Sequence, residues 1–255
     1  MRSSVCALVA RKIGWFMRTR PAWIDWQGGA ASFTFDDFPK SALATGGAIL
    51  EKHGFRGTYY TALKLAGTEN RLGAMFDVAD LRSAHRSGHE IACHTHSHLD
   101  CRYAPTASIE TDVGENSRAI ARLIDDLAPT NFAYPYGAVS IAAKCALAGR
   151  FASCRGTGEG INHGAVDLAD LRVVTLYDRL FDAEALCRRI DEARATNGWA
   201  IFYTHDVADR SSEYGCKPEQ LDAVVGYAAQ HLRVLPVREV TARFAGGLAG
   251  GVAAA

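Results

Sequence analysis

The stretch Ala31-Ser-Phe-Thr-Phe-Asp-Asp37 decides how the rest of the chain is interpreted. Its first five residues are aromatic, small or β-branched, and such a short run predicts a β-strand over Ala31–Phe35. Two adjacent carboxylates, Asp36 and Asp37, follow directly. Both are therefore expected at the carboxyl end of this strand.

Seven further runs share this character, and segments of helical periodicity lie between most of them. We expect the other strands at Gly57–Tyr60, His89–Cys93, Asn131–Tyr134, Phe151–Cys154, Leu171–Thr175, Ala200–Thr204 and Arg233–Val237. We expect helices at Ser41–His53, Val78–Ser87, Ser108–Leu127, Ser140–Ala148, Ala183–Thr196 and Lys217–His231.

Repeated strand–helix–strand units predict a parallel sheet with right-handed crossovers. Seven or eight such units in one chain favour a single α/β domain folded as a (β/α) barrel, regular or distorted. An open doubly wound sheet is the alternative. No glycine-rich phosphate loop follows the first strand, which argues against nucleotide binding.

The composition allows one substantial core and shows no sign of a polyanionic partner. The chain has 255 residues, of which 48% are hydrophobic. Lys+Arg and Asp+Glu number 28 each, which argues against binding to nucleic acid or to an anionic membrane. The cysteines at positions 6, 93, 101, 145, 154, 187 and 216 have no disulfide or zinc-site spacing, and we expect them to be reduced and mostly buried.

The predicted catalytic barrel spans residues 30–240, and the segments before and after it are interpreted separately. Residues 1–29 are interpreted as an N-terminal extension packing on the barrel. Within it, Val5–Phe16 is a candidate basic amphipathic helix, with membrane-interface binding as the alternative. Its apolar run is too short for a secretory signal, and no stretch has the roughly 20 apolar residues of a membrane span. A cytoplasmic location is therefore expected, and the Gly/Ala-rich residues 241–255 are expected to form a flexible tail.

Polar side chains follow four of the predicted strands. Beside the aspartate pair, these are His94, His96 and His98, then Tyr134 to Tyr136, then His205 with Asp206. The carboxyl ends of parallel barrel strands share the face where active sites form, so these groups are expected in one cleft. Singly, each has a plainer interpretation, since aspartates often cap loops and a histidine at a strand end is commonly structural. Their shared position favours an active site.

The residue types suit a divalent metal. A dication would neutralise one of two adjacent carboxylates and leave the other to act as a base. His94 and His98, four residues apart, can bring two imidazoles to one ion. Two histidines and one carboxylate leave positions open for water and substrate, as in a catalytic site. His205, across the cleft, is suited to protonate a departing amine.

At these residues the chain resembles the polysaccharide deacetylase family, carbohydrate esterase family 4, also called the nodulation-deacetylase homology domain. Thr34–Asp37 is similar to its first motif, T-F-D-D, and His94–His98 to its second, H-[ST]-x-x-H. Ile201–His205 is similar to its late apolar strand ending in histidine. The resemblance covers about residues 30–237 and implies a distorted (β/α) barrel of the polysaccharide deacetylase type with seven or eight strands.

The resemblance also implies a role for each matching residue. Thr95 would support its loop by hydrogen bonds, and His96 would not be a ligand. Three residues would act in catalysis and three would bind the metal: Asp36 as general base, His205 as general acid and the Tyr136 N–H as oxyanion donor, with Asp37, His94 and His98 as ligands.

Two features of the family are missing. Pro135 and Tyr136 match its third motif, R-x-P-Y, but no arginine precedes them. That arginine orients the base, and the candidates to replace it are Tyr134, through its hydroxyl, and Arg155, through its charge. The family's aspartate–tryptophan motif has no match either. Asp167 and Asp170 lie in the corresponding stretch, without a following tryptophan.

The sequence therefore predicts a hydrolase acting on a non-peptide carbon–nitrogen bond, which removes an N-acyl group, by preference acetyl, from an amino sugar, oligosaccharide or glycan. Water activated by one divalent metal would be the nucleophile, with Zn²⁺ expected and Co²⁺ or Ni²⁺ also suited. One alternative is a deacetylase or deformylase of a small sugar metabolite or of a lipid- or nucleotide-linked sugar. The other is a catalytically weak barrel that binds glycans. The sequence does not indicate the oligomeric state.

Overall fold

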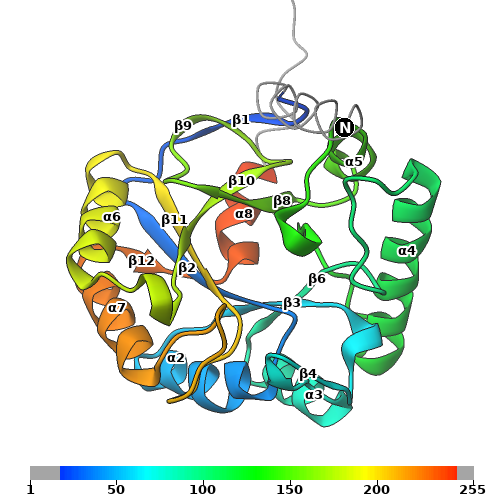
Figure 1. Ribbon diagram of the computed structural model, residues 1–255. Helices are drawn as coiled ribbons and strands as arrows, with labels where there is room; N and C mark the ends of the chain where they lie inside the picture. Colours follow the sequence, from blue (N-terminus) through cyan, green and yellow to red (C-terminus); the bar gives the residue numbers. More distant parts are fainter. Residues whose placement is uncertain (1–17, 246–255) are drawn as a thin grey trace, which may run out of the picture.

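The computed structural model describes residues 18–245 of the chain. The candidate helix at Val5–Phe16 and residues 246–255 of the predicted tail lie outside this range. Seven parallel strands form a closed ring with helices around it (Figure 1). They are β2 (Ala30–Asp36), β3 (Thr58–Thr61), β6 (Glu90–Cys93), β7 (Asn131–Ala133), β8 (Ser153–Glu159), β10 (Leu171–Thr175) and β11 (Trp199–Thr204).

The ring closes where β11 pairs with β2, from Trp199 opposite Ala30 to Thr204 opposite Phe35. The prediction of a (β/α) barrel is confirmed, and the open doubly wound sheet is wrong. The barrel is distorted because β12 (Arg233–Val234) also pairs with the start of β2, whereas β3 pairs with β2 only from Thr34 onward. The predicted strand Arg233–Val237 is too long. Pro236 has no N–H for a ladder, and Val237 begins a helix.

Helices cover the outside of the barrel between most successive strands (Figure 1). A π-helical segment at Ala42–Gly47 and α2 (Ala48–Lys52) follow β2, and further along the chain come α3 (Val78–Arg86), α4 (Thr106–Leu123), α5 (Ile141–Ala148), α6 (Ala183–Ala195) and α7 (Pro218–His231). The Asp77, Ser140 and Asp182 side chains cap the first turns of α3, α5 and α6. Helix α4 ends before the predicted Leu127, because Asp125 and Asp126 adopt positive φ angles.

No helix lies between β8 and β10. Instead, β9 (Gly164–Asp167) forms an antiparallel pair with β1 (Pro21–Ile24) beside these strands (Figure 1). Ile24 and Trp26 are buried in the same cluster as Leu171 and Trp199. This pair of short strands was not predicted, because four residues on an edge lack the alternation of a longer strand.

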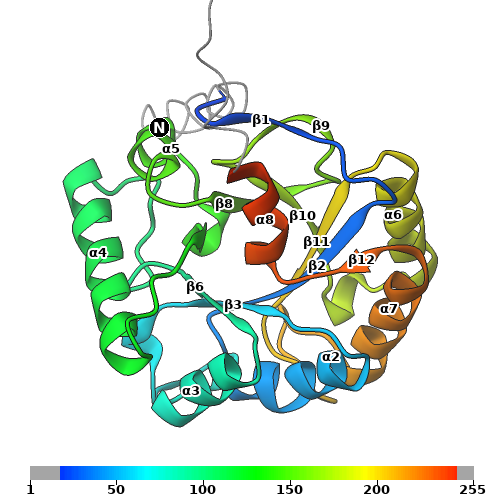
Figure 2. The same ribbon diagram turned by 180° about the vertical axis from the view of Figure 1, so that it is seen from behind.

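Helix α8 (Val237–Ala245) lies across the middle of the barrel, as Figure 2 shows. The Val237 N–H donates to Thr58 Oγ1 at 3.0 Å, and the Arg238 N–H donates to Glu90 Oε2 at 2.7 Å. Thr58 and Glu90 are the first residues of β3 and β6, so α8 closes the end of the barrel opposite the predicted cleft. The predicted tail at 241–255 therefore starts too early, since residues 241–245 are helical and Thr241 is buried.

Alternation along the strands sends successive side chains to the outside and to the inside of the barrel. Phe33 and Phe35 pack outward in the main core cluster, whereas Ser32 faces inward and accepts a hydrogen bond from Trp199 Nε1 at 3.0 Å. Asp36 continues the inward series of β2. The same alternation directs every second residue of β6, β8 and β11 toward the barrel interior. The pleat therefore brings polar groups of distant strands together.

The six cysteines within residues 18–245 are all free, and Cys93, Cys101, Cys154 and Cys216 are buried. This agrees with the expectation of reduced, mostly buried thiols. None of the helices described is long and apolar enough to span a membrane.

Candidate active site

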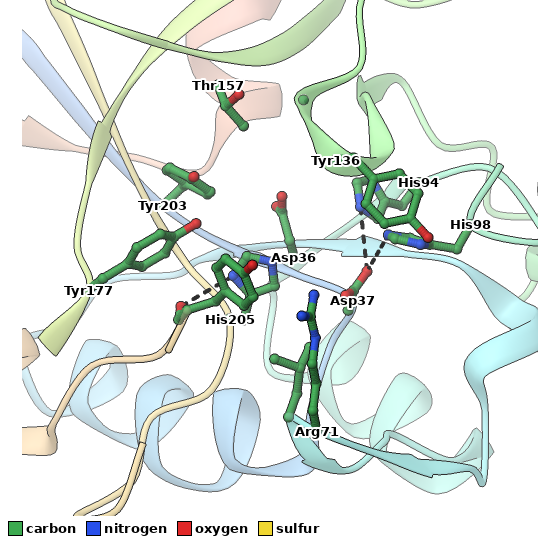
Figure 3. Close-up of a pocket in the computed structure, with 13 residues that line it drawn as sticks. Asp36, Asp37, Arg71, His94, His98, Tyr136, Thr157, Tyr177, Tyr203 and His205 are labelled. Carbon is green, nitrogen blue, oxygen red and sulfur yellow. Dashed lines mark hydrogen bonds and ion pairs between the residues drawn. The ribbon is translucent and has the colours of Figure 1, made fainter. Parts of the chain in front are cut away.

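A pocket with a cavity volume of about 230 Å³ opens at the carboxyl ends of the barrel strands (Figure 3). It brings together every site residue predicted from the sequence: Asp36, Asp37, His94, His98, Tyr136 and His205. The pocket also includes residues that the sequence analysis did not select, namely Arg71, Leu72, Gly137, Thr157, Tyr177, Tyr203 and Tyr214. Apart from Tyr203, which lies within the matched stretch Ile201–His205, these residues lie on loops and strand ends outside the recognised motifs.

Asp37, His94 and His98 form a candidate metal site. Each offers one ligand atom, and the three atoms lie within 4.8 Å of one another. Asp37 Oδ1 is 3.0 Å from His98 Nε2 and 3.5 Å from His94 Nε2 (Figure 3). His96 is not part of this cluster, as expected, and its Nε2 lies 3.6 Å from a Glu115 oxygen.

The donor set fits a cation. His94 Nδ1 lies 2.8 Å from the Ala133 carbonyl oxygen, which can only accept, so Nδ1 carries the proton and the Nε2 lone pair faces Asp37. Burial is the main cause that lowers the pKa of His94, to about 4. Asp37 Oδ1 is buried, and no hydrogen bond of normal geometry reaches it from the residues described. Lone pairs therefore face one another across a space that a divalent ion would fill.

Backbone strain is concentrated here. Asp37, Thr95, His98 and Tyr136 have φ angles of 61°, 58°, 57° and 60°. Non-glycine residues rarely adopt this left-handed region, and each instance costs about 1–3 kcal/mol, so it persists only where the surrounding structure enforces it. Four such residues around one pocket indicate that packing holds these loops in the geometry that the site requires.

Asp36 lies beside the candidate ligands but has a different partner. Its carboxylate accepts a hydrogen bond from Arg155 Nη2 of β8. Arg155 is fully buried, with its guanidinium 4.8 Å from the Tyr60 ring centre and 5.1 Å from that of Tyr203. Burial raises the pKa of Asp36, but the charge of Arg155, with those of His94 and His205, outweighs it, so the net shift is downward.

Of the two residues that the sequence left open as partners of Asp36, Arg155 is the one that contacts it. The other candidate, Tyr134, is wrong, because its hydroxyl donates to the Ala169 carbonyl at 3.0 Å. Tyr134 is buried in a separate apolar cluster with Phe132 and Cys154.

His205 is oriented by a backbone carbonyl. The backbone N and the ring Nδ1 of His205 lie 3.1 and 3.2 Å from the Tyr214 carbonyl oxygen. The loop that brings Tyr214 there is held by Asp206, whose carboxylate accepts hydrogen bonds from Ser212 N and Oγ.

Asp167 and Asp170, which lie in the stretch that corresponds to the family's aspartate–tryptophan motif, do not line the active-site pocket. Their carboxylates lie 2.6 and 3.7 Å from Lys144 Nζ, in a different cavity of the structure. The carbonyl partner of His205 was missed because any residue type can supply a backbone oxygen, so no sequence signal marks it.

The family model for polysaccharide deacetylase matches residues 26–148, which contain both the aspartate pair and the histidine motif. This segment of the chain belongs to the polysaccharide deacetylase family. A chitin deacetylase from Arthroderma benhamiae is 28% identical over 113 residues, or 44% of this chain. The match spans only 29% of that relative's length.

Solved structures show that the deacetylase-type barrel extends over most of the chain. A polysaccharide deacetylase from Mycobacterium smegmatis, described as putative, superposes with a TM-score of 0.63 at 16% identity, covering 91% of this chain and 96% of that one. A family 4 acetyl xylan esterase from Clostridium thermocellum gives 0.57 at 18% identity, covering 84% and 91%. At such low identity the likeness establishes the fold alone.

Tyr136 lies next to the candidate metal site. Its ring meets that of His98 edge-on, with centroids 4.4 Å apart, and its side chain is 61% exposed. The following Gly137 is required, because a Cβ there would lie 2.0 Å from Thr157 Oγ1. This close packing sets the backbone of Tyr136 at the pocket rim.

A hydrogen-bond network that includes a side chain of α4 supports the loop of residues 94–98. Asp112 of α4 accepts hydrogen bonds from His96 N and Ser97 N at 2.5 and 3.0 Å. Thr95 Oγ1 accepts from Leu99 N at 2.8 Å, which is the supporting contact expected for this residue. Asp112 was not predicted, since a carboxylate on a helix surface is usually solvated.

Proposed function

We propose that this chain is a metal-dependent N-deacetylase of amino sugars. The observation that carries the proposal is the cluster of Asp37, His94 and His98. A second carboxylate, Asp36, lies beside it and is paired with the buried guanidinium of Arg155. A closed structural site would use four protein ligands, whereas three leave room for water and substrate.

Asp37, His94 and His98 would hold one divalent ion. Two imidazoles and a carboxylate suit Zn²⁺, and also Co²⁺ or Ni²⁺. When bound, such an ion lowers the pKa of water and polarises an acyl carbonyl. The Clostridium thermocellum acetyl xylan esterase was solved in complex with a cobalt ion, which supports metal binding by this chain.

Asp36 is proposed as the general base. The Arg155 guanidinium holds it as a carboxylate, because losing that charge would leave Arg155 buried without a counter-ion. One carboxylate oxygen is engaged by Arg155, and the group also lines the pocket. There it can take the proton from the water that attacks the acyl carbon.

His205 is proposed as the general acid. The Tyr214 carbonyl can only accept, so it holds the proton on Nδ1 and leaves Nε2 free to carry the proton for the departing amine. In Figure 3, His205 lies across the pocket from His94 and His98. The Tyr136 N–H is proposed to donate to the oxyanion on the acyl oxygen. Acetate and the free amine would then leave.

The test is release of acid from a panel of acylated sugars by metal-reconstituted protein. The panel contains N-acetylglucosamine, chitooligosaccharides, N-formyl sugars and O-acetylated xylan, with chelated protein as the control. Acetate from N-acetyl substrates only when metal is present supports the proposal. Release from O-acetyl substrates alone would make the protein an esterase. Glycan binding without release would indicate a catalytically weak barrel.

A further inference from the structure

A second cavity adjoins the active-site pocket. Its volume is about 610 Å³, and it lies between the hairpin of β4 (Glu69–Asn70) and β5 (Gly73–Ala74) and the loop that follows His205. Arg71 and Leu72, at the hairpin tip, line both cavities. We call the second cavity the side groove, and its polar side chains are Lys40, Ser41, Asn70, Arg71, Asp206, Arg210, Ser211 and Ser212. A ligand in the pocket that extends past Arg71 therefore enters the side groove.

The side groove presents hydrogen-bond donors that lack partners. The Ser211 hydroxyl is buried, and no group in residues 18–245 forms a hydrogen bond with it. Arg210 is exposed and forms no ion pair within the same range. The carboxylate that lines the groove, Asp206, is buried and already accepts from Ser212 N and Oγ. A ligand of this surface should therefore supply hydrogen-bond acceptors.

Arg71 stands where the pocket meets the side groove and points into the pocket (Figure 3). Its Nη1 lies 3.1 Å from Glu213, and its guanidinium lies 4.6 Å from the Tyr214 ring centre. The side chains of Arg71 and Glu213 are 64% and 55% exposed, so water weakens this pair and a ligand anion can replace it. Lys40 differs, because Asp77 and Asp80 both lie 2.5 Å from its Nζ and neutralise it.

We propose that the side groove binds a phosphate ester carried by the amino sugar, so that the substrates are phosphorylated N-acyl amino sugars. This rests on the deacetylase function proposed above. A guanidinium binds phosphate through two parallel hydrogen bonds. Phosphate brings at least three acceptor oxygens, which suits two arginines together with hydroxyl and amide donors better than the two oxygens of a carboxylate do.

The experiment compares kcat/KM for acetate release from N-acetylglucosamine 1-phosphate, UDP-N-acetylglucosamine and unmodified N-acetylglucosamine. We expect the phosphorylated sugars to be favoured about tenfold or more, and Arg71→Gln and Arg210→Gln each to reduce this ratio about tenfold, as for loss of a charged hydrogen bond. Arg188→Gln is the matched control. It removes the same charge from the exposed face of α6 and should leave the ratio unchanged. Preference for the UDP-sugar alone that neither Arg71→Gln nor Arg210→Gln reduces would indicate recognition of the uridine and would overturn the phosphate site.

Failure of the inference and failure of the function give different results. Equal kcat/KM for charged and neutral sugars, unaltered by Arg210→Gln, overturns the phosphate site and leaves the deacetylase in place. If no sugar releases acetate, the deacetylase proposal fails, and calorimetry with N-acetylglucosamine 1-phosphate then decides the site. Binding that Arg210→Gln weakens supports the site, whereas absent or unaltered binding overturns it.

Discussion

Arg155 on β8 forms an ion pair with Asp36 on β2, 119 residues away in the chain. The two strands are not neighbours, since β8 pairs with β7 and β10, and β2 pairs with β3, β11 and β12. The contact therefore crosses the barrel interior. Both groups are buried, so neither can lose its charge without leaving the other uncompensated in a medium of low polarity.

Removing the arginine should harm both stability and activity. We expect Arg155→Met to lower the free energy of unfolding by about 3–5 kcal/mol, because Asp36 becomes an unpaired buried charge. The rate of acetate release should fall at least about 100-fold, and Arg155→Lys should lose less of both. Urea denaturation and acetate assays measure the two effects. If Arg155→Met is equally harmful in an Asp36→Asn background, the two residues are not coupled.

Substituting the proposed base and substituting a proposed metal ligand should have different effects on the metal content of the protein. We expect Asp36→Asn to keep one equivalent of metal while kcat falls about 10²–10⁴-fold, because only the proton acceptor is removed. His94→Ala should lose both metal and activity, since one of three ligands is gone. Elemental analysis of the purified variants, beside acetate release, distinguishes them. Near-normal turnover by Asp36→Asn would refute its assignment as the base.

The position of His205 should depend on Gly215, a residue that does not line the active-site pocket. A Cβ at Gly215 would lie 2.4 Å from Asp206 Oδ1, so Gly215→Ala must displace the loop that carries the Tyr214 carbonyl. We expect kcat to fall about tenfold or more with metal content unchanged. Gly149→Ala is the control, because a Cβ there meets nothing within 4 Å. Equal kinetics in the two variants would show that the carbonyl does not position His205.

His89 should make stability depend on pH. Its Nδ1 accepts a hydrogen bond from the Gly57 N–H at 2.9 Å, and its Nε2 lies 3.0 Å from Glu51. Burial lowers its pKa, with Arg56 and Arg238 adding to the shift, although Glu51 opposes it. A histidine held neutral contributes stability above its unfolded pKa of about 6.5, and this is lost as pH falls below that value toward the folded pKa.

His89→Gln tests this linkage. At pH 7.5 we expect it to be less stable than the wild type by about 1–3 kcal/mol, because the Gly57 N–H loses its acceptor. The difference should shrink as pH falls from 7 to 5, since only the wild type must take up a proton on the histidine. Urea denaturation at several pH values measures it. A difference that stays constant over this range would contradict the prediction.

Much of the fold was predictable because strand and helix periods are local properties. The barrel strand Leu171–Thr175 has the bounds expected from its sequence, and Ser140 begins α5 as a cap. The errors lie where tertiary contacts decide. The β1–β9 pair lies over the side of the barrel that lacks a helix (Figure 1), and Ile24 and Trp26 are buried there. Helix α8 forms at residues that looked like the start of a tail, because Val237 and Val240 pack against the barrel core.

The sequence by itself determined the barrel and brought Asp36, Asp37, His94, His98, Tyr136 and His205 to one face, because the carboxyl ends of parallel strands must meet there. Only the tertiary structure decided what surrounds them. Arg155 reaches Asp36 across the barrel interior, and the Tyr214 carbonyl reaches His205 from a loop. The physical reason is that both contacts depend on the direction of a side chain or a carbonyl after folding, and the spacing of residue types does not encode that direction.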